Sequence, residues 1–130
     1  MTSPHEPAPL SERQIEIMNV VWERGRTTVA EVWEALFARR EVARNTVQTL
    51  MTRLEEKGWL AHEPHGTAYR YFALRRREAT LRGMVERLVN TAFAGSADML
   101  VMALLEGRGV SEAEAQRIRS MIEKAERSVP

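Results

Sequence analysis

The stretch "NTVQTLMTRLEEKG", residues 45–58, decides the fold because it forms a helix with two unlike faces. Apolar residues recur at i, i+3, i+4 and i+7, which is the spacing of a stripe that faces a protein core. The opposite face carries amides and hydroxyls, and no acid occurs before Glu55. Such a helix is expected to pack on one side and to bind a partner through the other. The apolar stripe consists of Val47, Leu50, Met51 and Leu54.

Two further helices are expected before this stretch. Ser11 with Gln14, and Thr28 with Glu31, have the spacing of capping boxes, in which side-chain oxygens satisfy backbone N–H groups at a helix start. Gly25 is expected to end the first helix, and the second is expected to run to about residue 39. The side chains expected to face inward are Ile15, Met18 and Trp22 in the first helix, and Val29, Val32, Trp33 and Leu36 in the second.

A β-hairpin is expected after the helix at 44–57, which Gly58 should end. Residues 59–63 and 68–74 have the composition of strands, and Pro64 and Gly66 favour a turn between them. The order helix, helix, helix, hairpin over residues 10–74 is that of a winged helix-turn-helix. The predicted fold class is mainly α with a small β-hairpin wing, followed by a helical tail.

The tail, residues 75–130, is expected to be a helical dimerisation region. Ser96 and Ser111 are suited to begin two of its helices, and the run from Met99 to Leu105 is apolar on every side. A helix of that kind needs partners all round, which a second copy of the chain can supply. The alternative is packing of this helix wholly against the amino-terminal domain. The candidate dimerisation residues are Leu81, Met84, Val85, Leu88, Leu100, Val101, Leu104, Leu105, Ile118, Met121 and Ile122.

The outer face of the helix at 44–57 suits the base edges of double-stranded DNA. Amides can bind adenine, guanidinium groups can bind guanine, and a threonine methyl can pack on thymine. The hairpin and the start of the second helix would contact phosphates and position the protein. A plain solvated helix face is the alternative. The candidate DNA-binding residues are Thr28, Arg44, Asn45, Thr46, Gln48, Thr49, Arg53, Lys57, His65, Thr67 and Arg70.

Charge is distributed unevenly along the chain. The formal net charge is only +1. Residues 39–77, however, hold nine Lys and Arg against four acids, a net of +5 that leaves −4 for the rest of the chain. A basic middle between acidic ends favours a polyanionic partner such as DNA.

Composition and motifs argue against catalysis and against a metal site. Cysteine is absent, which excludes disulfides, thiol catalysis and cysteine metal ligation. His62, Glu63 and His65 lie close together but lack helical zinc-motif spacing and a third ligand. No phosphate-binding loop or nucleophile motif is present. We therefore expect no cofactor, no metal and no enzymatic activity.

The amino-terminal residues 1–9 contain three prolines and no hydrophobic periodicity, so a disordered tail is expected there. No signal-peptide pattern is present. The longest apolar run, Met99 to Leu105, is too short to span a bilayer. A cytoplasmic protein with one DNA-binding domain, residues 10–74, is the resulting expectation.

These motifs resemble those of the penicillinase-repressor family of bacterial transcription regulators, the BlaI/MecI type. The similarity covers about residues 10–127 and rests on "LSERQIEIMNVVWERG", "TTVAEVWEAL", "NTVQTLMTRLEEKGWL", "YRYFAL" and "AFAGSADMLVMALLEG". The resemblance implies a homodimeric repressor that binds palindromic operators, often with TACA or TGTA half-sites. It also implies a membrane sensor-protease that relieves repression by cleaving the repressor.

Two features depart from the family pattern. The bond cleaved in the penicillinase repressors joins Asn to Phe, whereas the matching candidate cleavage residues here are Ala103 and Leu104. The copper-responsive relatives carry carboxy-terminal cysteines, which this chain lacks.

Two alternative functions stay open on the sequence: a winged-helix adaptor that binds another protein, and a regulator that binds a small ligand between its tail helices.

Overall fold

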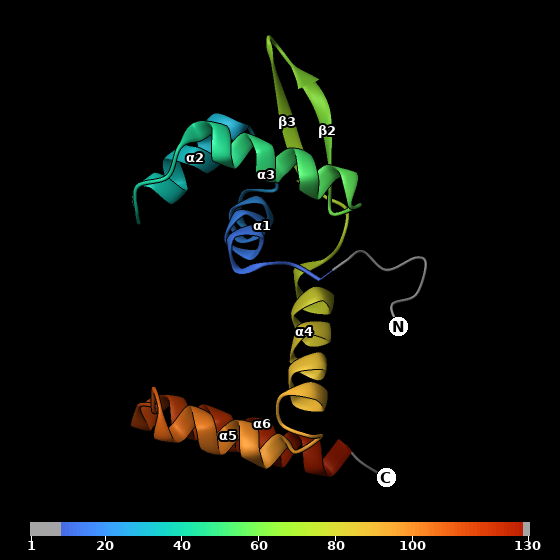
Figure 1. Cartoon of the computed structure of the whole chain (residues 1–130). Helices are drawn as coiled ribbons and strands as arrows, with labels where there is room; N and C mark the ends of the chain where they lie inside the picture. Colours follow the sequence, from blue (N-terminus) through green and yellow to red (C-terminus); the bar gives the residue numbers. More distant parts are fainter. Residues whose placement is uncertain (1–8, 129–130) are drawn as a thin grey trace. The chain divides into compact units, whose positions relative to one another are not determined.

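Three helices and a hairpin fold together in the amino-terminal part of the chain, and three more helices follow (Figure 1). The structure is a computed structural model, and it describes residues 9–128. The fold class expected from the sequence is confirmed, because helices dominate and one small antiparallel sheet accompanies them. Except for Pro9, the predicted tail at residues 1–9 lies outside the described residues. In chain order the elements are α1 (Glu12–Arg24), β1 (Arg26–Thr27), α2 (Val29–Phe37), α3 (Arg44–Glu56), β2 (Leu60–His65), β3 (Ala68–Ala73), α4 (Arg77–Thr91), α5 (Ala97–Glu106) and α6 (Glu112–Ser128).

The chain divides into two compact units, residues 1–84 and 85–130. The dividing point falls within α4, ten residues beyond the predicted end of the DNA-binding domain at residue 74. That functional boundary remains a prediction.

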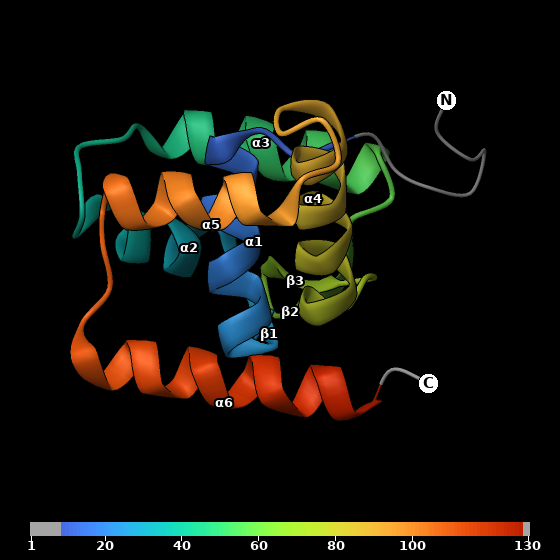
Figure 2. The ribbon, with the colours of Figure 1, turned by 90° about the horizontal axis from the view of Figure 1, so that it is seen from below.

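The core of the first unit lies where α1, α2, α3 and the hairpin meet. Figure 1 views α1 nearly along its axis while α3 lies across the view, and Figure 2 shows the same steep crossing from below. Of the predicted stripe on α3, Val47, Met51 and Leu54 are fully buried, whereas Leu50 is half-buried. The buried apolar residues are Ile17, Met18, Val20, Val21, Val32, Leu36, Val47, Met51, Leu54, Trp59, Leu60 and Tyr71.

Both predicted capping boxes form. The Ser11 hydroxyl accepts from the backbone N–H of Gln14 at 3.2 Å, and the Gln14 side chain accepts from the Ser11 N–H at 2.9 Å. Thr28 and Glu31 make the equivalent pair of bonds at 3.1 and 3.0 Å. These reciprocal bonds satisfy backbone donors that the first turns of α1 and α2 would otherwise leave unpaired.

The predicted inward face of α1 is wrong by about one residue. Gln14, Ile17 and Val21 are buried together with Met18, whereas Ile15 and Trp22 are only half-buried. Gln14 can be buried because its amide is already bonded in the capping box. The Trp22 indole N–H donates instead to the carbonyl of residue 75 at 2.8 Å, at the edge of the core.

The sheet has three antiparallel strands in the order β1-β3-β2. The two-residue strand β1, which the sequence did not predict, pairs Arg26 with Phe72 and Thr27 with Tyr71. The predicted turn at residues 64–67 is too wide, because β2 continues to His65 and the turn is closed by Gly66 and Thr67 alone. Gly66 has φ 63°, which suits a type II′ turn with glycine first.

The second unit lacks a core of its own. Neither α4 nor α5 buries a side chain, and the described part of α6 is likewise half-buried or exposed. Large apolar side chains on α5 and α6 are therefore open to solvent, among them Met102 and Met121, which are 56% and 64% exposed. No helix within residues 9–128 has the length and apolar content that crossing a membrane would require.

Replacing Leu54, which is fully buried, by Ala should lower the free energy of unfolding by about 2–5 kcal/mol, because the change leaves a cavity in the core. The matched control is Leu74→Ala, since Leu74 is 55% exposed. That control should change stability by less than about 0.5 kcal/mol. Urea denaturation followed by tryptophan fluorescence measures both. Equal losses for the two variants would contradict the burial assigned to α3.

Candidate nucleic-acid interface

The outward half of α3 is polar and basic along its whole length. It is opposite the buried stripe, so rotating α3 to cover it would expose the apolar residues. Thr46 is half-buried at the margin of this surface. The exposed residues are Arg44, Asn45, Gln48, Thr49, Thr52 and Arg53, with the acid Glu56 at the end of the helix.

An open hollow of about 550 Å³ runs along this outer face, and a smaller one of about 250 Å³ lies beside it toward the start of α3. The structure therefore brings the predicted base-reading residues together on one surface. Hydrogen-bond donors and acceptors line the hollow, so it can accommodate a polar edge such as that of a base pair. The larger hollow is lined by Asn45, Gln48, Thr49, Thr52, Arg53 and Glu56.

Most polar groups of this surface have no partner within the protein. The Thr52 hydroxyl donates to the backbone carbonyl of Gln48 at 3.0 Å. Across the part of the chain that the structure describes, no hydrogen bond or ion pair engages the side chains of Asn45, Thr49 and Arg53, nor that of Gln48. These groups are available to an external ligand.

The start of α3 differs from the starts of α1, α2 and α5. Each of those helices begins with a Ser or Thr hydroxyl that accepts a backbone N–H. Ala43 holds that position before α3, no side chain caps it, and the first turn contains no acid. Backbone donors at the positive end of the helix dipole are thus left for an anion, with Arg44 beside them.

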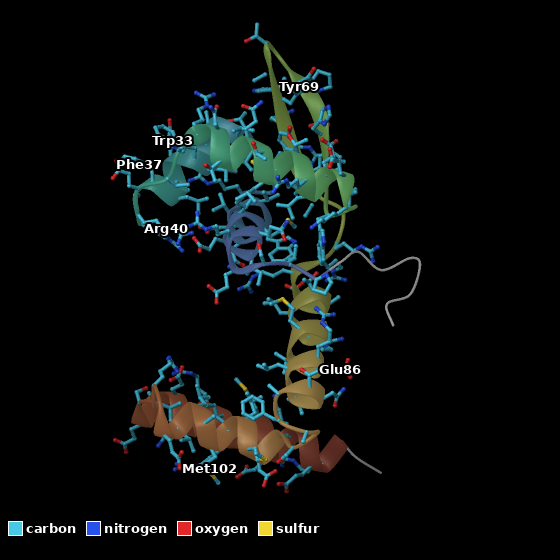
Figure 3. The ribbon with its side chains drawn as sticks, viewed as in Figure 1. Trp33, Phe37, Arg40, Tyr69, Glu86 and Met102 are labelled. Carbon is cyan, nitrogen blue, oxygen red and sulfur yellow. The ribbon has the colours of Figure 1, made fainter. Side chains whose placement is uncertain are left out.

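Exposed cations flank the hollow, but some basic side chains of this region are already paired with an acid. Arg53 and Lys57 form no ion pair within residues 9–128. Arg40, in the loop that follows α2 (Figure 3), is held by the carboxylate of Glu16 at 2.9 and 3.0 Å. Arg53 and Lys57 can therefore neutralise phosphates, whereas Arg40 is already neutralised.

Thr28 lies at the start of α2, where the capping box occupies its hydroxyl and its N–H. Hydrogen bonding of the Glu31 carboxylate to the backbone N–H and the side chain of Thr28 holds the pKa of Glu31 below its usual value, with smaller contributions from the charges of Arg24 and His65. Glu31 therefore keeps its negative charge at neutral pH. A phosphate contact at Thr28 would have to use the neighbouring backbone N–H groups of the first turn.

The wing is the β2–β3 hairpin, and its tip is exposed. His65 and Thr67 lie at the two-residue turn, and Tyr69 extends from β3 near the tip (Figure 3). Tyr69 is 54% exposed. Side chains here can lie along a phosphate backbone without reading sequence.

Arg70, predicted to contact phosphate, belongs to a network at the base of the wing. The Glu63 carboxylate accepts from Arg26 at 2.8 Å and from Arg70 at 3.3 Å. The Arg26 guanidinium also lies over the ring of Phe72, 4.9 Å from its centroid. One acid shared by two arginines leaves a net charge of about +1 at this place, so Arg70 is less free than Arg53.

Comparison with known proteins shows the family. Residues 10–124 match the penicillinase repressor family. The chain belongs to the penicillinase-repressor family. The transcriptional regulator BlaI of Mycobacterium tuberculosis is 33% identical over 110 residues, 83% of this chain and 80% of that protein. The methicillin resistance regulatory protein MecI of Mammaliicoccus sciuri is 23% identical over 115 residues, 88% of this chain and 94% of that protein.

A solved structure of a relative includes DNA. The monomeric form of BlaI from Bacillus licheniformis, in complex with the blaP half-operator, has 26% sequence identity and a TM-score of 0.50. The match covers 56% of this chain and 89% of that one. The winged helix predicted for this repressor is thereby confirmed, and so is the prediction that it is not an enzyme, because the family consists of transcriptional repressors.

The residues considered for a metal site in this repressor have other partners. His62 lies against Glu55, and Glu63 lies between two arginines. Within residues 9–128, no group of three His, Cys, Asp or Glu is arranged to hold a metal ion.

Sequence reasoning missed two charged groups of the interface region. His62 Nδ1 lies 2.6 and 2.8 Å from the carboxylate oxygens of Glu55, which joins β2 to α3. Nothing in the spacing of these two residues predicts the contact, since it depends on the direction in which the chain leaves α3. Arg26 was missed because β1 is too short to show a period. The pairing of Glu63 with Arg70 could have been predicted, because a two-residue turn places them opposite each other.

The predicted dimerisation and cleavage residues of the repressor all lie on α4, α5 and α6. Leu81, Met84, Leu100 and Ile118 are half-buried, and the other seven predicted dimerisation residues are exposed. Ala103 and Leu104 lie inside α5, where the Ala103 carbonyl accepts from Gly107 at 3.0 Å. Dimerisation and cleavage themselves stay predictions.

Replacing Gln48 by Ala should cost about 1–3 kcal/mol of binding on the preferred DNA sequence and little on random DNA, because an amide reads a base edge. Arg53→Ala is the contrasting variant, and it should weaken binding to both duplexes alike, because a phosphate contact carries no sequence information. Fluorescence anisotropy with the two duplexes measures the losses. An equal loss on both duplexes for Gln48→Ala would contradict the base-reading role.

Proposed function

We propose that this family member is a sequence-specific transcriptional repressor that binds palindromic operators as a homodimer. In this proposal α3 enters the major groove and the wing lies along the adjacent phosphate backbone. The observation that carries it is the outward face of α3, whose amides and arginines form no hydrogen bond or ion pair within residues 9–128, while Val47, Met51 and Leu54 on its other face are buried. An exposed helix face of that kind matches the groups that read base edges.

Two further features support DNA over a protein partner. The uncapped start of α3 offers backbone donors to a phosphate, and free cations flank the hollow. Bacillus licheniformis BlaI, a relative with the same winged helix, is known in complex with a half-operator. An adaptor that binds a protein would not need a basic surface beside an uncapped helix start.

The homodimer is proposed because the second unit has apolar surface without a core. Met99, Val101 and Leu105 on α5 are each about half exposed, and Met121 and Ile122 on α6 are more than half exposed. Exposed apolar area of this extent is rare on monomers and marks an interaction surface. A second copy of the chain carries the same helices, so a symmetric pair buries both sets.

Relief of repression is proposed to follow cleavage between Ala103 and Leu104 by a membrane sensor-protease. The bond lies within α5, so the helix has to open before a protease can reach it. Cleavage there would divide the most apolar helix of the proposed dimer interface. Two half-length helices could not keep the interface, and operator affinity would fall.

Selection of bound duplexes from random sequences by the full chain tests the DNA-binding proposal. The expected result is a palindrome with half-sites about 10 base pairs apart, or a multiple of that. Affinity for the selected duplex should fall steeply as salt rises, because neutralised phosphates release counterions. Binding that shows neither sequence preference nor a salt slope would favour a protein partner.

Leu105→Asp tests the homodimer. Leu105 is 51% exposed in the single chain, so the variant should fold, but a carboxylate at a dimer contact would be buried without a partner. Sedimentation should give a monomer, and affinity for a palindromic duplex should fall by about 100-fold or more, because the second half-site contact is no longer intramolecular. Leu74→Asp, at a similarly exposed residue of the first unit, should remain dimeric. A dimeric Leu105→Asp protein would place the interface elsewhere.

A further inference from the structure

The last turn of α3 is joined to the wing by one ion pair. His62 Nδ1 lies 2.8 Å from Oε1 and 2.6 Å from Oε2 of Glu55. A carboxylate can only accept hydrogen bonds, so Nδ1–H is the donor to both oxygens. The two side chains are 36% and 31% exposed, which shields the pair from solvent in part.

Tyrosines of β3 complete the surroundings of His62. Its ring lies 4.5 Å from the ring of Tyr69 and 5.5 Å from the ring of Tyr71, measured between centroids. Burial raises the pKa of Tyr71, and the charge of Glu55 raises it further, so the phenol stays neutral. The polar groups that face His62 are therefore the carboxylate of Glu55 from α3 and the two phenols of β3.

We infer that Glu55 and His62 are positioning residues, which hold the wing against the recognition helix α3. The inference rests on the proposed binding of DNA by α3 and the wing. Both elements can contact one duplex only if their relative placement is fixed. The pair also offsets the charge of Glu55, which is one of the two acids of α3, both in its last turn.

The direction in which DNA affinity changes when Glu55 is replaced distinguishes a positioning role from the effect of its charge alone. Removal of an acid from a DNA-binding surface ordinarily strengthens binding, because phosphate repulsion is lost. Glu56 is the matched control, since it is the next residue, is exposed and forms no ion pair in the described residues. On a random-sequence duplex, Glu56→Gln should bind more tightly than the unmodified chain. Glu55→Gln should bind two- to fivefold more weakly, roughly the worth of a partly exposed ion pair.

Substitution of the other partner supplies the second readout, with the full chain and the same duplex. His62→Ala, which removes the donor, should weaken binding two- to fivefold, as Glu55→Gln does. His62→Gln, which keeps a side-chain N–H donor, should restore most of that affinity, and only while Glu55 is present. Thermal denaturation of each variant confirms that it is folded.

The outcomes are distinguishable from failure of DNA binding itself. If the unmodified chain does not bind the duplex in a salt-dependent manner, the proposed function is wrong and this inference fails with it. If the chain binds but Glu55→Gln strengthens binding as Glu56→Gln does, the positioning role alone is overturned. Unchanged affinity in His62→Ala also overturns it.

Discussion

The contact on which the rest of the first unit depends is the burial of Val47, Met51 and Leu54 from α3. These side chains are inaccessible to solvent and occupy successive turns of one helix, so they fix the rotation of α3 about its own axis. Rotation by even one residue would move a polar group into a tightly packed interior. Core packing therefore orients the outward amides and arginines, and no further contact is needed to fix their direction.

The two units differ in how much of their apolar surface they bury. The first closes a core from three helices and a small sheet, with twelve buried apolar residues. The second leaves its apolar side chains on open helices, which is a costly arrangement for a chain alone in water. Association of the proposed dimer would cover these side chains, so the stability of that unit should increase with protein concentration.

Local signals in the sequence were enough for most elements. Hydroxyl and carboxamide spacing located the starts of α1 and α2, and apolar periodicity identified the buried face of α3. The inward face of α1 was misjudged because Gln14 is polar, and only its bond within the capping box allows it to be buried. The strand β1 and the Glu55–His62 pair could not be predicted, since each depends on where a distant segment is placed. Residue types predicted which face of α3 would be polar and exposed, and its role in reading bases stays a prediction. The ion pairs that distinguish Arg70 from Arg53 could not be predicted, because they depend on the folded arrangement of the sheet.

The shortness of β1 determines how stiff the wing is along its length. β1 contributes partners only for Tyr71 and Phe72, so β3 is a central strand there and, among the described residues, is paired with β2 alone toward the tip. A two-stranded ribbon twists more readily than a three-stranded sheet. The outer half of the hairpin can thus follow a groove of varying width at little elastic cost, while its inner half stays fixed to the core. Under the proposed function, operators that differ in local groove geometry could be bound by one protein without any change in the residues that read their bases.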